Sequence, residues 1–185
     1  MKVFIKKKAF GDKIVLENKT LEFPEGKASA ILGPSGRGKT TLIRILAGLD
    51  KDYEGYIEDG CEKPVILFQE DRLVESISLL SNLSMVSEDK ERMAYLISKL
   101  GLKGEEKNRV SSFSGGMKRR AAIARALLVD SDVLFLDEPF KGLDEAIRKE
   151  TAALIRSECR GRTVIIITHD RIEAELLGVE NYVRL

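Results

Sequence analysis

A glycine-rich octapeptide, GPSGRGKT, has residue types and a spacing that point to chemistry. Its glycines let the backbone wrap closely around an anion, so that successive N–H groups can converge on phosphate oxygens. Lys39 would reach the β- and γ-phosphates of a nucleoside triphosphate, and the Thr40 hydroxyl would ligate Mg²⁺. The residues that this loop assigns to the nucleotide are Gly33, Pro34, Ser35, Gly36, Arg37, Gly38, Lys39, Thr40 and Thr41. An ordinary glycine-rich turn is the alternative, but the run lies between a predicted buried strand and a predicted helix, as a phosphate-binding loop requires.

Two adjacent carboxylates close a second apolar run, VLFLDE at 133–138. Asp137 would hold Mg²⁺ through water, and Glu138 would orient and deprotonate an attacking water molecule. Their position suits this chemistry, because ligands of α/β sheets bind beyond the carboxyl ends of the strands. The alternative is that the acidic pair merely ends a strand.

A helix N-terminus is predicted at Ser114, within the stretch SSFSGGMKRRAAIARALL at 111–128. Serine is a favoured N-cap residue, and Gly115 and Gly116 allow close backbone approach. Because a helix N-terminus attracts anions, this would be a second phosphate site. On this stretch alone, a capped helix of the core is the favoured interpretation.

The elements that must position these residues are short apolar runs alternating with helical patterns. Strands buried on both faces of a parallel sheet are predicted at 28–33, 64–69, 133–138 and 163–169. Helical periodicity covers 40–48, 93–100, 114–128 and 144–158. Antiparallel strands or a hairpin are predicted at 3–7 and 14–23. The sequence therefore predicts an α/β fold with a mainly parallel sheet and N-terminal antiparallel strands. We expect one domain over 1–185, with a mostly helical insertion from 71 to about 104 inside a helical subdomain at about 71–128.

The charge balance argues against one class of partner. The 31 basic and 30 acidic side chains nearly cancel, and the basic ones form no broad patch. Nucleic-acid binding is therefore not expected, since neutralising phosphates requires a local cationic excess.

The two cysteines lack paired spacing and are expected to be free thiols of a reducing compartment. The apolar runs are too short to cross a bilayer and the first residues do not form a signal peptide, so we expect a cytoplasmic protein.

Together these motifs resemble those of the ATP-binding cassette (ABC) ATPases, in the family's order from Phe4 to about His169. The motifs are GPSGRGKT, LFQE with Gln69, FSGGM, VLFLDE, KGLDE with Asp144, and IITHD with His169. The only glutamine and the only histidine of the chain both fall within them. The resemblance implies a P-loop NTPase (RecA-like) core that hydrolyses ATP with Mg²⁺.

The resemblance also implies roles that the residues alone do not assign. Phe10 would stack on adenine, and the alternative is a phenylalanine of the core. Gln69 would contact Mg²⁺ or the attacking water and relay the nucleotide state to the helical insertion. Glu138 would be the general base, Lys39 would hold the phosphates, and His169 would contact the γ-phosphate.

A second set of roles implies two copies of the chain. Ser114 and Gly116 would contact the γ-phosphate bound by the opposite protomer, with Gly115 in the same nucleotide-binding set, and Asp144 would help to pair the protomers. An ATP-bound homodimer is therefore expected. Met117 stands where the family usually has glutamine or a similar polar residue, which removes one possible ribose contact.

The function that the resemblance implies is ATP hydrolysis that powers solute transport through a separate transmembrane subunit. The chain would then lie at the inner face of the cell membrane, with a helix of that subunit docked between the Gln69 loop and residues 72–86. The stretch after Gln69 is similar to that of small importer ATPases for nitrate-, sulfonate- and taurine-like solutes. One alternative is a soluble ABC ATPase with a mechanical or regulatory role. A more distant one is a P-loop kinase in which the FSGGM stretch is coincidental.

Overall fold

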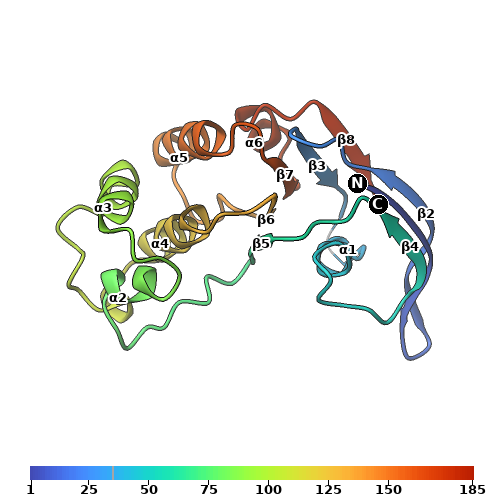
Figure 1. The fold of residues 1–185 in the computed structure, drawn as a ribbon, viewed down its shortest axis with the longest axis horizontal. Helices are drawn as coiled ribbons and strands as arrows, with labels where there is room; N and C mark the ends of the chain where they lie inside the picture. The colour runs from blue at the N-terminus through green and yellow to red at the C-terminus, as the bar shows by residue number, and fades with distance from the viewer. Residues whose placement is uncertain (35) are drawn as a thin grey trace.

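The computed structural model describes residues 1–34 and 36–185, and a five-stranded parallel sheet leads into the glycine-rich loop (Figure 1). In spatial order, its strands are β5 (Pro64–Leu67), β6 (Val133–Asp137), β7 (Thr163–Ile167), β3 (Ala28–Leu32) and β8 (Asn181–Arg184). β6 and β7 are buried along their whole length, as parallel strands covered on both faces should be. The predicted α/β fold with a mainly parallel sheet is confirmed.

A smaller antiparallel sheet lies at one end of the molecule (Figure 1). In spatial order, its strands are β2 (Lys13–Glu22), β1 (Lys2–Phe10) and β4 (Glu54–Glu58). β1 and β2 form a hairpin whose last pair is Phe10 and Lys13, so the N-terminal antiparallel strands are confirmed. β4 was not expected from the sequence.

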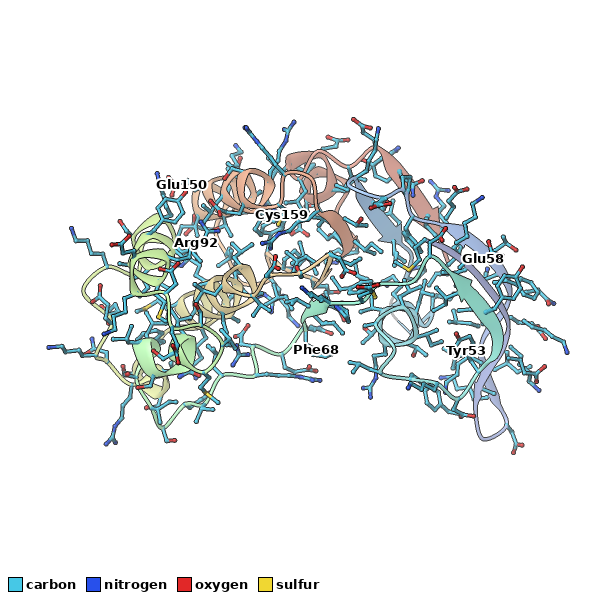
Figure 2. The ribbon with its side chains drawn as sticks, viewed as in Figure 1. Tyr53, Glu58, Phe68, Arg92, Glu150 and Cys159 are labelled. Atoms are coloured by element: carbon cyan, nitrogen blue, oxygen red, sulfur yellow. The ribbon has the colours of Figure 1, made fainter. Side chains whose placement is uncertain are left out.

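The helices gather around the parallel sheet and at the end opposite the antiparallel sheet (Figure 1). They are α1 (Lys39–Leu46), α2 (Leu79–Ser84), α3 (Lys90–Lys99), the 3₁₀ turn η1 (Val110–Ser112), α4 (Gly115–Leu128), α5 (Glu145–Glu158) and α6 (Arg171–Leu176). Arg92 on α3 pairs with Glu158 on α5, which ties the outlying helices to the rest of the molecule. Figure 2 shows Arg92 on the side of α3 that faces α5.

The stretch from 71 to 104 is less helical than expected, because only α2 and α3 interrupt its loops. The buried side chain of Asn82 explains part of the difference. Its Oδ1 accepts from the Val74 N–H at 2.8 Å, and its Nδ2 donates to the Val74 carbonyl at 3.0 Å. These bonds occupy the backbone groups that a helix at 74 would need, so the helix begins only at Leu79.

Each face of the parallel sheet is buried in its own apolar cluster. Leu134 and Leu136 of β6 belong to the cluster that contains α4 and α5, whereas Phe135 belongs to the cluster with α1 and β1. This alternation is the period of two that a strand requires. The two clusters hold the ends of β3 and β6 in place. The glycine-rich loop follows the end of β3, and Glu138 follows the end of β6.

Side-chain caps fix the starts of the two longest helices. Ser114 Oγ accepts from the Met117 N–H at 3.3 Å, which confirms the predicted N-cap of α4. Asp144 Oδ1 accepts from the Ile147 N–H at 2.9 Å and caps α5.

In the described part of the chain, no helix has both the length and the apolar character to cross a bilayer.

Candidate active site

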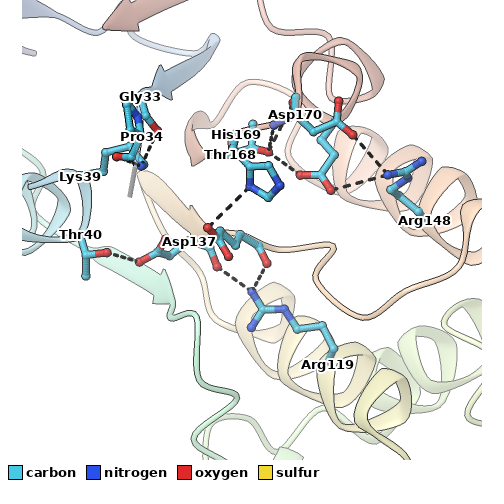
Figure 3. Close-up of polar contacts among 12 residues, drawn as sticks. Gly33, Pro34, Lys39, Thr40, Arg119, Asp137, Arg148, Thr168, His169 and Asp170 are labelled. Atoms are coloured by element: carbon cyan, nitrogen blue, oxygen red, sulfur yellow. Dashed lines mark hydrogen bonds and ion pairs between the residues drawn. The ribbon is translucent and has the colours of Figure 1, made fainter. Parts of the chain in front are cut away.

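The glycine-rich loop connects the end of β3 to the start of α1, as predicted (Figure 3). Lys39 Nζ donates to the carbonyl oxygens of Gly33 at 2.7 Å and Pro34 at 2.9 Å, so its ammonium lies across the beginning of the loop. Ser35, which the sequence also assigns to the nucleotide, lies outside the described residues. The loop therefore presents a fixed cation next to the N-terminus of a helix, which together favour a phosphate.

Gly38 shows why this loop needs glycine. Its φ of 86° lies in the left-handed region, and a Cβ there would stand 2.6 Å from Val15 Cγ1. The hairpin strand β2 thus presses directly on the loop just before α1 begins. A larger residue would have to push β2 away.

The first turn of α1 is joined to the end of β6. The Thr40 hydroxyl donates to Asp137 Oδ2 at 2.7 Å, and Asp137 is only 3 % exposed (Figure 3). Burial raises the pKa of the Asp137 carboxyl, while the Thr40 hydrogen bond opposes the rise. Mg²⁺ is usually held by one or two protein oxygens together with phosphates and water, and these two side chains offer oxygens of the right kind.

Glu138 and His169 meet at the neighbouring strand ends. His169 Nδ1 lies 3.8 Å from Glu138 Oε1, and the histidine side chain is 78 % exposed against 23 % for the glutamate. Glu138 has a φ of 47°, a left-handed conformation that is uncommon outside glycine, and its N–H donates to the Ile167 carbonyl at 2.9 Å. This turn sends the glutamate away from the sheet at the carboxyl end of β6.

A cavity of about 290 Å³ brings the loop and the strand ends together. Its lining residues are Val15, Gly36, Gly38, Lys39, Thr40, Thr41, Gln69, Asp137, Glu138 and Ile167. The structure therefore unites Lys39, Thr40, Gln69 and Glu138, which come from three separate parts of the chain. Val15 and Ile167 were not singled out from the sequence, because an apolar residue in a strand carries no sign of a site.

Several predicted site residues lie outside this cavity. Ser114 and Gly115 are exposed at the start of α4, and Asp144 is exposed at the start of α5. Gly116 packs near the loop before α5, where a Cβ would stand 3.4 Å from the Gly142 carbonyl. None of these four lines the cavity.

Two further predicted residues are exposed and do not line the cavity. Phe10 is 56 % exposed at the end of β1, and Arg37 is exposed within the loop. The ammonium of Lys8 lies 4.6 Å from the centroid of the Phe10 ring. Phe10 therefore presents an aromatic surface at the hairpin whose second strand presses on Gly38.

The sequence reasoning missed Arg119, which is 2 % exposed and donates to the Phe68 carbonyl after β5. It also donates to the Asp137 carbonyl at the end of β6 (Figure 3). One signal was available. Arg119 occupies the same helical stripe as the buried residues Ala122, Ile123 and Ala126, at spacings of three, four and seven. A charge within an apolar stripe indicates a buried ionic contact.

Comparisons with known proteins agree with this geometry. The family model described as ABC transporter matches residues 16–141. The aliphatic sulfonates import ATP-binding protein SsuB 2 of Burkholderia lata is 36 % identical over 187 residues, which cover 94 % of this chain and 68 % of that protein. SsuB 1 of Paracoccus denitrificans is 42 % identical over 177 residues, covering 92 % and 73 %, and SsuB of Bacillus subtilis is 40 % identical over 197 residues, covering 96 % and 77 %.

Solved structures give the same fold. The ATP-binding cassette MJ0796, in a dimeric post-hydrolysis state bound to ADP and Pi, superposes with a TM-score of 0.82 at 27 % identity, covering 100 % of this chain and 93 % of that one. A second dimeric structure of MJ0796, described as a bacterial ABC transporter cassette, has a TM-score of 0.81 at 24 % identity, covering 99 % and 94 %.

Proposed function

The chain belongs to the ABC transporter family, and we propose that it is the ATP-hydrolysing subunit that powers solute import through a separate membrane subunit. The observation that carries the proposal is the cavity that joins the glycine-rich loop to Gln69 and Glu138. Nucleotide binding alone would not require the Glu138 carboxylate and the Gln69 amide in the same cavity as the loop. Small aliphatic sulfonates are the proposed solute class, after the names of the relatives.

The triphosphate would be bound by the loop and the start of α1. Lys39 would place its ammonium on the β- and γ-phosphates, and the exposed N–H groups of the first helical turn would complete the cradle. Thr40 and Asp137 would hold Mg²⁺, with Gln69 close enough on the cavity wall to assist. When bound, Mg²⁺ neutralises negative charge on the phosphates. Phe10 would stack on the adenine ring.

Hydrolysis would depend on Glu138 and His169. Glu138 would orient a water molecule and accept its proton as the water oxygen bonds to the γ-phosphorus. The bond from that phosphorus to the β–γ bridging oxygen breaks at the same time, and ADP is the leaving group. The exposed His169 would donate a hydrogen bond to a γ-phosphate oxygen, from a position beside the glutamate. Phosphoryl transfer needs little covalent help from the protein, so positioning and charge stabilisation provide the rate acceleration.

The residues outside the cavity support a second half-site. Ser114, Gly115 and Gly116 begin a 14-residue helix, and the first two are exposed there. Such a terminus would bind the γ-phosphate held by a second copy of the chain, with Asp144 beside that contact. We therefore propose an ATP-bound homodimer built from two copies of one nucleotide-binding domain.

The membrane subunit would dock on a groove beside Gln69. This groove, of about 160 Å³, runs between the segment after β5 and α4. Its lining residues are Val65, Ile66, Leu67, Phe68, Glu70, Asp71, Arg72, Val86, Ala122, Arg125, Ala126 and Val129. A short helix of the membrane subunit, with an apolar face and a polar flank, fits such a lining. The chain would then work at the cytoplasmic face of the membrane.

Replacing Lys39 tests the enzymatic part of the proposal. The Lys39→Ala variant should lose about 100-fold or more in Mg·ATP hydrolysis, because a preorganised cation disappears from the phosphates. Lys103→Ala, at an exposed position outside the cavity, is the matched control and should hydrolyse ATP like the parent protein. Undiminished turnover by the Lys39→Ala variant would refute the assignment.

Crosslinking tests the transport part. In a chain whose Cys61 and Cys159 are replaced by serine, a cysteine at the exposed Glu70 or Val86 should crosslink to a membrane protein in native membranes. A cysteine at Glu22, on the antiparallel sheet, should not. Capture of soluble proteins alone at the groove would favour a role outside transport.

A further inference from the structure

The guanidinium of Arg119 fixes the backbone that carries the two acidic residues of the site. Nη2 donates to the carbonyl oxygens of Asp137 at 2.7 Å and Glu138 at 2.8 Å, and Nε donates to that of Pro139 at 2.9 Å. Three consecutive carbonyls at the end of β6 are therefore held by one side chain from α4. Figure 3 shows the contacts to the first two of them.

The Nη1 nitrogen of the same guanidinium holds the loop after β5. Nη1 donates to the Phe68 carbonyl at 2.7 Å and to Asp71 Oδ1 at 3.1 Å. Gln69 lies between these two partners in the sequence and lines the cavity. One planar group thus connects α4, the end of β6 and the Gln69 loop.

The conformation of Glu138 gives this connection a consequence for catalysis. A non-glycine residue with a φ of 47° costs on the order of 1 kcal/mol and persists only where its surroundings hold it. The Glu138 N–H is held by Ile167, and its carbonyl is held by Arg119. Loss of the contact between Arg119 and the Glu138 carbonyl would let the peptide bond after Glu138 rotate. The Glu138 carboxylate would then turn away from the cavity.

Only arginine has the shape for this task. Burial lowers the pKa of Arg119, and the nearby Asp71 carboxylate opposes that change. A guanidinium nevertheless stays protonated in proteins and presents five N–H donors in a fixed plane. Lysine has a single nitrogen, so it could not reach the ends of both β5 and β6 at once.

We propose that Arg119 is a positioning residue that couples the Gln69 loop to the catalytic carboxylate Glu138. This inference rests on the proposed function. Phe68 and Asp71 also line the groove assigned to the membrane subunit, and Arg125 of the same helix donates to the Asp71 carbonyl at 3.1 Å. A helix bound in this groove that shifts the loop after β5 would move Phe68 and Asp71. Both are direct partners of the Arg119 guanidinium, which also holds Glu138.

The first test separates positioning from stability. Arg119→Lys should lower kcat for ATP about 10-fold to 100-fold, as expected when a reacting group is misplaced by about 1 Å. The Kd for Mg·ATP should stay within about threefold, because Arg119 makes no hydrogen bond to the described residues of the glycine-rich loop, 33–34 and 36–38. Arg92→Lys is the matched control: Arg92 pairs with Glu158, which belongs neither to the cavity nor to the α4 terminus, so kcat should be unchanged even where Tm falls by the same amount.

The second test asks whether the loop and Glu138 share one connection. Asp71→Asn should lower kcat in the parent protein, but it should add little to the loss in an Arg119→Lys background. Arg119→Ala should regain part of its activity when guanidinium ion is added at millimolar concentration. An unchanged kcat in Arg119→Lys overturns the proposal, and a fully multiplicative loss in the double variant overturns the link to the loop. If the parent protein itself hydrolyses no ATP, the proposed function fails instead.

Discussion

Thr40 and Asp137 are joined by a hydrogen bond of 2.7 Å although they stand 97 positions apart in the chain. The bond ties the first turn of α1 to the end of β6, so the phosphate-binding and acidic halves of the site share one rigid contact. The Asp137 carboxylate is buried at this point, and burial raises its pKa. Its negative charge therefore does not stabilise the fold. We therefore expect Asp137 to serve binding and not the stability of the fold.

Replacing Asp137 by asparagine should raise the stability of the nucleotide-free protein while abolishing hydrolysis. Burial raises the pKa of Asp137, so the folded state binds its proton more tightly than the unfolded chain. Stability therefore falls as the pH rises from the ordinary aspartate pKa through the raised one, and the ionised group is unfavourable at neutral pH. Calorimetry should show a higher Tm for Asp137→Asn at pH 7, with a difference that shrinks toward pH 4. A lower Tm at pH 7 would contradict this account.

Glu138→Gln should trap a dimer in the presence of Mg·ATP. The substitution removes the base but leaves the phosphate contacts intact, so ATP would bridge the loop of one protomer and the α4 terminus of the other. Light scattering should give a dimer with Mg·ATP and mainly monomer without nucleotide.

Adding Ser114→Arg to Glu138→Gln should abolish this dimer yet spare much of the ATP binding, because Ser114 does not line the cavity of its own chain. If Ser114→Arg destroys ATP binding by the monomer, the α4 terminus acts within one chain and the two-copy arrangement is wrong.

Gly38→Ala should weaken both folding and nucleotide binding. The new Cβ would collide with Val15 and would occupy a left-handed backbone, so β2 and the loop must separate. Gly48→Ala is the matched control, because its φ of 69° is also left-handed but its Cβ would meet nothing within 4 Å. We expect a loss of about 1 kcal/mol for the control and clearly more for Gly38→Ala in chemical denaturation. Equal losses would show that the contact with Val15 is unimportant.

Lys8→Met should destabilise the protein by about 3 kcal/mol, because it leaves Asp50 largely buried without its partner. The Lys8 side chain is 1 % exposed, and its ammonium lies 2.9 Å from Asp50 Oδ1. Lys6→Met is the matched control, since Lys6 pairs with Glu54 at the surface and should change Tm little.

The same ion pair predicts a dependence on pH. The hydrogen bond from Lys8 lowers the pKa of Asp50, so its contribution is present above the ordinary aspartate pKa and is lost as the pH falls through the lowered value. The pKa of Lys8 is raised, chiefly by Asp50, so its contribution is lost only as the pH rises through that raised value. Urea titrations should therefore show a penalty for Lys8→Met that is constant near neutral pH and fades in acid. A penalty as large in strong acid as at pH 7 would exclude the pair as its cause.

Local patterns in the sequence predicted most of the fold and most of the cavity. The glycine-rich loop, the Ser114 cap and the strand that ends in Asp137 each depend on neighbours in the chain, so their spacing was sufficient. β8 was missed because its four residues, NYVR, are too few to reveal a period. The late start of α2 depends on Asn82 and Val74, whose pairing becomes visible only once the chain turns back.

Arg119 could not be assigned for a related reason. Its partners lie about 20 positions after it and about 50 before it, and they are backbone carbonyls, which every residue type possesses. No residue identity at those positions marks the contact. What the sequence did offer was a charge on an apolar stripe, which indicates burial but not a partner.

The order of the parallel sheet also bears on how the protein is made. β3, which leads into the glycine-rich loop, is flanked by β7 and β8, the last two strands of the chain. On the ribosome, β3 therefore stays with both edges unpaired until the residues of β7 and β8, up to Arg184, have been synthesised. An apolar strand in that state invites association with other nascent chains. We therefore expect ATP to stabilise chains in which β3 has paired with β7 and β8, and to give no help to chains that have not yet reached these strands.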